Sequence, residues 1–184
     1  MISRALLAVL LSLALVPPAL AQQAPTSPPA KKKPVAAAPR TAAPKAIGTF
    51  DDWTAATHQE AGQPVCYAFT RAQSSMPAVA GRGDVILTVT QRVSGRDAVA
   101  IEAGFAYAPN ATVTVQADQT GLDFYTHQRA AFARNGHDAV TAFRAAARAI
   151  ARSPGPHDAT ITDTFSLKGF TAAYDAISKA CPAQ

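Results

Sequence analysis

The sequence predicts a mainly β fold: a β-sandwich or open barrel of about seven to eight short antiparallel strands, with two packed amphipathic helices toward the C-terminus. Two observations predict this class. Apolar and polar residues alternate along several short segments between residues 49 and 165, as in strands that bury one face. Two other segments repeat apolar residues every three or four positions, the period of a helix with one buried face.

Several segments carry the strand pattern, and residues that favour turns separate them. In the clearest three, Val65, Val85 and Val113 each begin a run in which every second residue is apolar. The expected strands are residues 49–56, 65–70, 85–90, 98–103, 112–115, 122–126 and 159–165, with turns at 81–83, 94–95, 109–110 and 118–121.

Both expected helices have one apolar stripe and a capping residue. The first is predicted over residues 138–152, capped by Asp138 and ended by Pro154. The second is predicted over about residues 167–180, capped by Ser166. The stripes are Val140, Phe143, Ala147 and Ile150 in the first helix, and Leu167, Phe170, Tyr174 and Ile177 in the second. We expect each stripe to pack against the sheet.

The first 21 residues have the composition of a secretory signal peptide. Arg4 precedes an apolar run over residues 5–16, and small residues precede a cleavage site after Ala21. A retained membrane anchor is the alternative, but a bilayer-spanning helix needs about 20 apolar residues, and this run is shorter. We therefore expect a periplasmic or secreted protein with no membrane-spanning helix after cleavage.

Residues 22–46 are expected to form an extended tether, because they contain six prolines and eight alanines. Their basic residues are Lys31, Lys32, Lys33, Arg40 and Lys45. These side chains either contact an anionic membrane surface or envelope polymer, or simply keep a spacer soluble. Residues 47–184, the expected single domain, carry 11 basic and 12 acidic side chains, which argues against a nucleic-acid-binding domain.

The chain has only two cysteines, Cys66 and Cys181. Export would take both into an oxidising compartment, so we expect them to form a disulfide that joins a strand to the end of the last helix. In the chain-entropy model, closing a loop of this length stabilises a fold by about 4 to 5 kcal/mol. The alternative, a reactive or metal-binding thiol, lacks a CxxC motif or a histidine partner nearby in the sequence.

No local catalytic or metal-binding pattern occurs in the sequence. The histidines, at positions 58, 127, 137 and 157, are too far apart for a helical or hairpin metal site, and HExxH and GxSxG motifs are absent. We therefore predict a protein without catalytic residues, cofactor or metal ion. A catalytic site assembled from distant residues stays open, because such sites are defined by geometry.

Asp163 is a candidate buried acid, because it alternates with Ile161 and Phe165 on the side of a strand that should face the core. It is either an acid with a raised pKa in a pocket or a structural carboxylate bonded to backbone N–H groups or to an arginine. The structural interpretation is favoured.

Two arginine motifs also suggest binding. Residues 82–84 spell Arg-Gly-Asp, the tripeptide that integrins recognise, but the same residues are ordinary turn formers before a strand. Arg144, Arg148 and Arg152 would form a stripe on the first predicted helix, which is a weak candidate for an anion-binding patch. A solvated flank near the helix C-terminus is the favoured alternative.

Several motifs resemble those of a known family. They are FDDW at residues 50–53, VCY at 65–67, GRGDVILTVT at 81–90, GFAY at 104–107, TDTFSLKGFTAAY at 162–174 and AISKAC at 176–181. In these motifs the chain resembles the invasion-associated locus B proteins of bacterial envelopes, over nearly all of residues 48–182. Residues 145–149 and 155–159 depart from the family pattern, and Phe132 stands where relatives tend to have Trp.

The resemblance implies a secreted or periplasmic β-rich protein with no established catalytic residues. We therefore expect an exported, non-catalytic envelope protein that contributes to host-cell interaction or to envelope integrity. The alternative is a periplasmic binding module for a small or polymeric anionic ligand, with arginines and exposed aromatic residues lining a groove.

Overall fold

The computed structural model describes residues 43–183, apart from the side chain of Asp158. The expected signal peptide, its cleavage site after Ala21, and residues 22–42 of the expected tether lie outside the described residues. The tether boundary needs a correction, because the first strand begins at Lys45. Lys45 and Ala46 therefore belong to the sheet.

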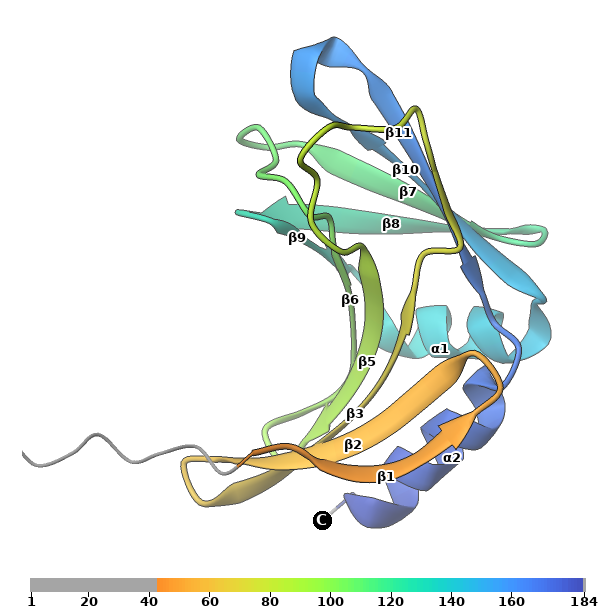
Figure 1. The fold of residues 1–184 in the computed structure, drawn as a ribbon. Coiled ribbons are helices and arrows are strands. Elements are labelled where there is room, and N and C mark those ends of the chain that lie inside the picture. The colour runs from red at the N-terminus through yellow and green to blue at the C-terminus, as the bar shows by residue number, and fades with distance from the viewer. Residues whose placement is uncertain (1–42, 184) are drawn as a thin grey trace, which may run out of the picture. The chain divides into compact units, whose positions relative to one another are not determined.

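Eleven strands form one large antiparallel sheet that is not closed into a barrel (Figure 1). The strands lie in the order β1-β2-β3-β5-β6-β9-β8-β7-β10-β11-β4. Their bounds are β1 Lys45–Phe50, β2 Trp53–Glu60, β3 Gln63–Arg71, β4 Ser74–Met76, β5 Ile86–Arg92, β6 Gly95–Glu102, β7 Thr112–Ala117, β8 Thr120–His127, β9 Ala130–Ala133, β10 Arg148–Pro154 and β11 Thr160–Ser166. The mainly β class is confirmed, but the chain forms more strands than predicted, in one continuous sheet.

The segment from β3 to β4 joins distant parts of the sheet order. β3 pairs with β2 and β5, whereas β4 pairs with β11 at the far edge. The switch occurs between two neighbouring residues, since the Ala72 N–H donates to the Val85 carbonyl and the Gln73 N–H donates to the Thr164 carbonyl. One extended segment therefore contributes to both parts of the sheet.

The strand expected over residues 49–56 is in fact a hairpin. β1 and β2 pair antiparallel around a turn at Asp51, which has a φ of 47°. Aspartate tolerates this left-handed conformation better than most residues, which is why the chain reverses here. The prediction also missed β4 and β9, whose three and four residues are too short for an alternating pattern to show.

The first predicted helix, residues 138–152, is wrong in its second half. α1 spans Gly136–Ala145, and its N-cap is Asn135, whose side chain accepts from the Asp138 N–H. Residues 148–154 form β10, which pairs with β7 and β11 on its two sides. Alanine favours helices in isolation, but two flanking strands satisfy the backbone of β10 and override that preference. Pro154 is the last residue of this strand, not a helix terminator.

The second helix, α2, spans Phe170–Ala180 and begins later than predicted. Its N-cap is Gly169, at a φ of 87°, where an added Cβ would overlap the Phe50 carbonyl oxygen. Ser166 is therefore not the cap. It is a buried residue of β11 whose carbonyl accepts a 3.0 Å hydrogen bond from the Trp53 indole N–H.

Both helices pack against the sheet and share one core (Figure 1). The Phe170 ring of α2 lies 4.9 Å from Trp53 of β2 and 5.6 Å from Phe143 of α1, measured between ring centroids. All three side chains are fully buried, and each contributes roughly 1.5 to 3 kcal/mol of hydrophobic stabilisation. The helix faces predicted from Phe143 and Phe170 therefore meet at the same place in the core.

Candidate functional site

Asp163 forms a buried ion pair with Arg82. It lies in β11, and both of its carboxylate oxygens accept from the Arg82 guanidinium at 2.8 Å. The side chain of Arg82 is only 5% exposed and that of Asp163 only 4%. A bidentate arginine–carboxylate contact combines two charge-assisted hydrogen bonds in one fixed geometry.

Neighbouring groups form further hydrogen bonds with both members of this pair. The Ser75 hydroxyl donates to Asp163 Oδ1 at 2.6 Å, and Arg82 Nε donates to the Ala103 carbonyl at 2.7 Å. The guanidinium also lies 5.0 Å from the centre of the Phe105 ring. Burial beside this cluster is the main reason that the pKa of Tyr107 is raised to about 12. Asp163 has the surroundings of a structural carboxylate rather than of an acid that faces a pocket.

The Arg-Gly-Asp motif is part of the same cluster. Arg82 is buried in the ion pair, and Asp84 pairs with Arg71. Gly104 has a φ of 75°, and an added Cβ there would overlap the Gly83 carbonyl, so the two glycines allow the loop to pack closely. The tripeptide therefore closes the loop over the ion pair and does not present a free arginine.

The predicted stripe of Arg144, Arg148 and Arg152 does not exist. Only Arg144 lies on α1, where it pairs with Asp175 of α2 and lies 4.7 Å from the Tyr174 ring centre. Arg148 and Arg152 lie on β10, exposed on the face opposite the buried Ala149 and Ala151. The error follows from the wrong helix, because α1 ends at Ala145 and leaves Arg144 on a different element from Arg148 and Arg152, which share one face of a strand.

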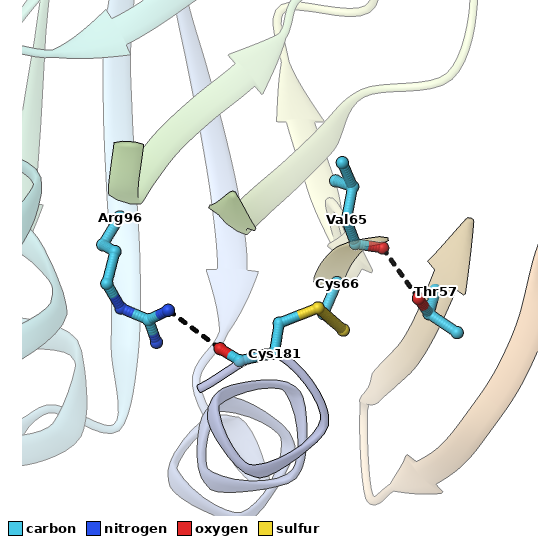
Figure 2. The surroundings of a disulfide bond; sticks show 5 residues. All are labelled: Thr57, Val65, Cys66, Arg96 and Cys181. Carbon is cyan, nitrogen blue, oxygen red and sulfur yellow. Dashed lines mark hydrogen bonds between the residues drawn. A yellow bond between two sulfur atoms is a disulfide. The ribbon is translucent and has the colours of Figure 1, made fainter. Parts of the chain in front are cut away.

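The disulfide between Cys66 and Cys181 is confirmed. It links β3 to the residue that follows α2, across 115 positions of sequence, with the two Cα atoms 5.9 Å apart. Figure 2 shows Arg96 of β6 beside it, donating to the Cys181 carbonyl at 2.8 Å. The bond and this hydrogen bond together hold the end of α2 against the sheet.

A second polar cluster, not anticipated from the sequence, surrounds Asp97. Its Oδ1 accepts from the Tyr174 hydroxyl at 2.6 Å and from Gln91 Nε2 at 2.7 Å. His137 Nδ1 lies 3.6 Å from the other oxygen. Burial raises the pKa of Asp97, but the hydrogen bonds from Tyr174, Gln91 and His137 together outweigh it, so the pKa is lowered. The cluster joins α2, the start of α1 and the paired strands β5 and β6.

A third polar group, Glu60 with Arg92 and His58, borders a pocket at the ends of two hairpins. Arg92 donates to both Glu60 oxygens at 2.9 and 3.0 Å, and His58 Nε2 lies 3.0 Å from Oε1. The hydrogen bonds from Arg92, with that from His58, lower the pKa of Glu60 to about 2. The carboxylate is therefore ionised at neutral pH. The adjoining pocket has a volume of about 430 Å³.

Within residues 43–183, no three His, Cys, Asp or Glu side chains are grouped so that they could hold a metal ion. In the same part of the chain, no helix is both long and apolar enough to cross a membrane. The polar clusters could be found only in three dimensions, because Arg82 and Asp163, and likewise Asp97 and Tyr174, are about 80 positions apart in the sequence.

Comparison with known proteins identifies the family. The model of the invasion associated locus B (IalB) protein family matches residues 53–178, well over half of the chain. A crystal structure of invasion associated protein B from Bartonella henselae is similar, with a TM-score of 0.54 and 16% identity over 72% of this chain and 95% of that chain. At this identity the likeness shows the fold alone. No curated protein matches the sequence. The family match extends from Trp53 of β2 into α2, and the chain belongs to the invasion associated locus B family.

Proposed function

We propose that the protein is exported and acts in the periplasm or at the cell surface as a non-catalytic envelope protein. Its contribution is to interaction with host cells or to the integrity of the envelope. The disulfide carries the proposal, because disulfides persist in oxidising compartments and are rare in the cytosol. The signal-peptide composition of residues 1–21 supports the same location.

A non-catalytic role is supported by how the buried polar groups are used. Asp163 and Arg82 bind each other, and the Asp97 carboxylate binds Tyr174 and Gln91. Both clusters connect elements that are distant in sequence, so each stabilises the fold. Groups engaged in this way are poorly placed to exchange protons or to attack a substrate.

The location can be tested with the native protein in the bacterium that produces it. We expect the chain to fractionate with the periplasm or envelope. Because both cysteines are buried, they are probed in denaturant, where they should react with a maleimide only after reduction. A variant that lacks residues 2–21 should stay in the cytoplasm with both thiols reactive. Cytoplasmic full-length protein with free thiols would contradict the proposal.

The role itself can be tested with a deletion strain. Impaired attachment to host cells with normal detergent resistance would support the interaction role, whereas detergent sensitivity would support the integrity role. Complementation with the Arg82→Lys variant is informative, since the buried guanidinium is proposed only to stabilise the fold. If attachment required a free Arg-Gly-Asp motif, a substitution at the exposed Asp84 would abolish it without destabilising the protein.

The second candidate function is a periplasmic binding module for a small or polymeric anionic ligand. Because the helical arginine stripe does not exist, this candidate depends on other basic residues. They are the exposed Arg148 and Arg152 of β10 and the basic residues that precede β1 in the sequence. Loss of binding to a soluble anionic polymer in an Arg148→Gln and Arg152→Gln double variant would favour this candidate.

A further inference from the structure

A row of aromatic and small side chains crosses the face of the sheet that lies opposite the helices. The strand register sets this row, because residues paired across neighbouring strands point to the same face. Phe69 pairs with Thr88, Thr88 with Ala100, Ala100 with Phe132, and Phe132 with Tyr125. We call these five residues, of β3, β5, β6, β9 and β8, the aromatic row.

The aromatic row is accessible, because the core and both helices lie on the other face of these strands. The residues that alternate with it, such as Leu87 of β5 and Ile101 of β6, are buried in the core that the helices share. Within the row, Tyr125 is 45% exposed and the other four side chains are half-buried. In Figure 1 the sheet curves at β5 and β6, so that this face is concave.

The row has aromatic ends and a centre of small side chains. Phe69 and Phe132 are three strand spacings apart, about 14 Å measured along the sheet, since neighbouring strands lie about 4.8 Å apart. Each has an aromatic neighbour: Tyr67 stacks 6.1 Å from Phe69, and Tyr125 stacks 5.5 Å from Phe132, measured between ring centroids. Two aromatic pairs therefore flank the small side chains of β5 and β6.

The absence of charge in the row indicates which kind of ligand it suits. None of its five members is charged, and its polar side-chain atoms are the hydroxyl groups of Thr88 and Tyr125. One arginine, Arg134, lies 5.9 Å from the Tyr125 ring centre, at the end of the row. A polyanion such as a nucleic acid needs several basic residues along its path, and the row provides none between its aromatic ends. The surface therefore suits an uncharged ligand with both apolar and hydroxyl groups.

A β-1,4-linked chain of glucose-type sugars has this chemistry. Its ring substituents are equatorial, which leaves apolar C–H groups on both faces of each sugar ring. Such C–H groups are attracted to the negative face of an aromatic ring, and sheet faces in other folds bind oligosaccharides. We propose that the aromatic row binds a neutral β-1,4-linked polysaccharide. One sugar stacks on the Tyr67–Phe69 pair and another on the Phe132–Tyr125 pair, and a sugar between them forms a hydrogen bond with the Thr88 hydroxyl.

This ligand goes beyond the proposed envelope role, and the proposal rests on that role only for bringing the protein into contact with such a polymer. Binding by the purified chain does not depend on its location, so it can fail while the export proposal stands, and the reverse also holds. The proposal also differs from the anionic-ligand candidate, which depends on Arg148, Arg152 and the basic residues that precede β1.

The test uses the full chain and three probes of equal length: cellohexaose, hexa-N-acetylchitohexaose and the anionic hexagalacturonate. Binding is measured by calorimetry, and NMR shifts of the Thr88 and Ala100 amides locate it. We expect at least one neutral probe to bind, and to bind about tenfold or more tightly than hexagalacturonate. No binding of either neutral probe at millimolar concentration, or equal binding of the anionic probe, would overturn the proposal.

Variants then assign the binding to the aromatic row. Phe69→Ala and Phe132→Ala should each weaken binding of the neutral probe by about tenfold, because each removes one stacking surface. Ala100→Glu should have a similar effect, because it places a long charged side chain between the two aromatic pairs. Met76→Ala is the matched control, since Met76 is 66% exposed and lies on β4, outside the row.

Thermal unfolding of each variant shows whether it is folded. Unchanged binding in Phe69→Ala and Phe132→Ala, with unfolding like that of the control, would overturn the proposal. If these variants are unstable, the amide shifts of the wild type decide, because a saccharide bound elsewhere would leave Thr88 and Ala100 unchanged. Self-association that Phe132→Ala abolishes, without saccharide binding, would mean that a second copy covers the row, and would equally overturn the proposal.

Discussion

The Arg82–Asp163 pair shows how a charged residue can occupy the core of this domain. Two charges are expensive to remove from water, and they are tolerated only when each is neutralised and hydrogen-bonded. Here the carboxylate has three hydrogen-bond donors, from Arg82 and Ser75, and the guanidinium also donates to the Ala103 carbonyl. Removing one partner therefore leaves the other charge buried alone.

We expect Asp163→Asn to lower the free energy of unfolding by about 3 to 5 kcal/mol, because Arg82 would keep its charge without a counter-ion. The measurement is urea-induced unfolding followed by tryptophan fluorescence. Asp84→Asn is the control, because Asp84 forms an exposed pair with Arg71, and it should change stability by less than about 1 kcal/mol. Equal effects of the two substitutions would mean that losing the buried pair costs no more stability than losing the exposed one.

Glu60 links stability to pH. Its pKa is lowered from 4.5 to about 2 in the folded protein, mainly by the hydrogen bonds from Arg92. The folded state therefore favours the ionised form, and this contribution is present above about pH 4.5 and is lost as the pH falls toward 2. We expect wild type to unfold at a higher temperature than Glu60→Gln at pH 6 and the difference to shrink steadily below pH 4.5. A difference that does not change with pH would contradict the assignment.

At the scale of elements, the local sequence predicted strands and helices well where packing agrees with intrinsic preference. The runs that begin at Val65, Val85 and Val113 lie in β3, β5 and β7, with Val85 itself just before the first residue of β5. Residues 148–152 were predicted incorrectly because alanine and arginine favour helices, and the competing preference comes only from the neighbouring strands β7 and β11. The disulfide adds a constraint between elements, since it joins β3 to the end of α2.

The start of α1 depends on a close backbone contact. A Cβ added to Gly136 would overlap the carbonyl oxygen of Asp97, the residue at the centre of the second polar cluster. We expect Gly136→Ala to destabilise the protein by about 1 to 3 kcal/mol, the usual cost of inserting a methyl group into packed structure. Gly95→Ala is the control, because no atom lies within 4 Å of an added Cβ there. Thermal unfolding measures both, and a neutral Gly136→Ala variant would show that the contact relaxes freely.

For the whole molecule, charge is divided unevenly along the chain. The first 46 residues carry six basic and no acidic side chains, whereas residues 47–184 have 11 basic and 12 acidic ones. Any attraction to anionic surfaces should therefore come from the N-terminal part of the chain. Such an electrostatic attraction weakens as the salt concentration rises, because salt ions screen it.

We expect the chain that begins at Gln22 to bind vesicles containing anionic lipid at low salt, and to lose binding as salt increases. Replacing Lys31, Lys32 and Lys33 with Gln should weaken binding by about a hundredfold, since each lysine near such a surface contributes on the order of 1 kcal/mol. The Arg148→Gln and Arg152→Gln double variant is the control and should bind normally. Loss of binding in the control, with normal binding of the lysine variant, would place the anionic contact on the domain.

The sequence by itself determined the mainly β class, the two helices near residues 143 and 174, and the burial of Asp163, because each follows from local periodicity. It also determined the pairing of Cys66 with Cys181, because the chain has only two cysteines. Only the tertiary structure decided that β10 is a strand, that one sheet of 11 strands replaces a sandwich, and that Arg82 is the partner of Asp163. It also brought Glu60 and Arg92 together from different hairpins. These outcomes depend on contacts between residues far apart in the sequence, and local preferences contain no information about them.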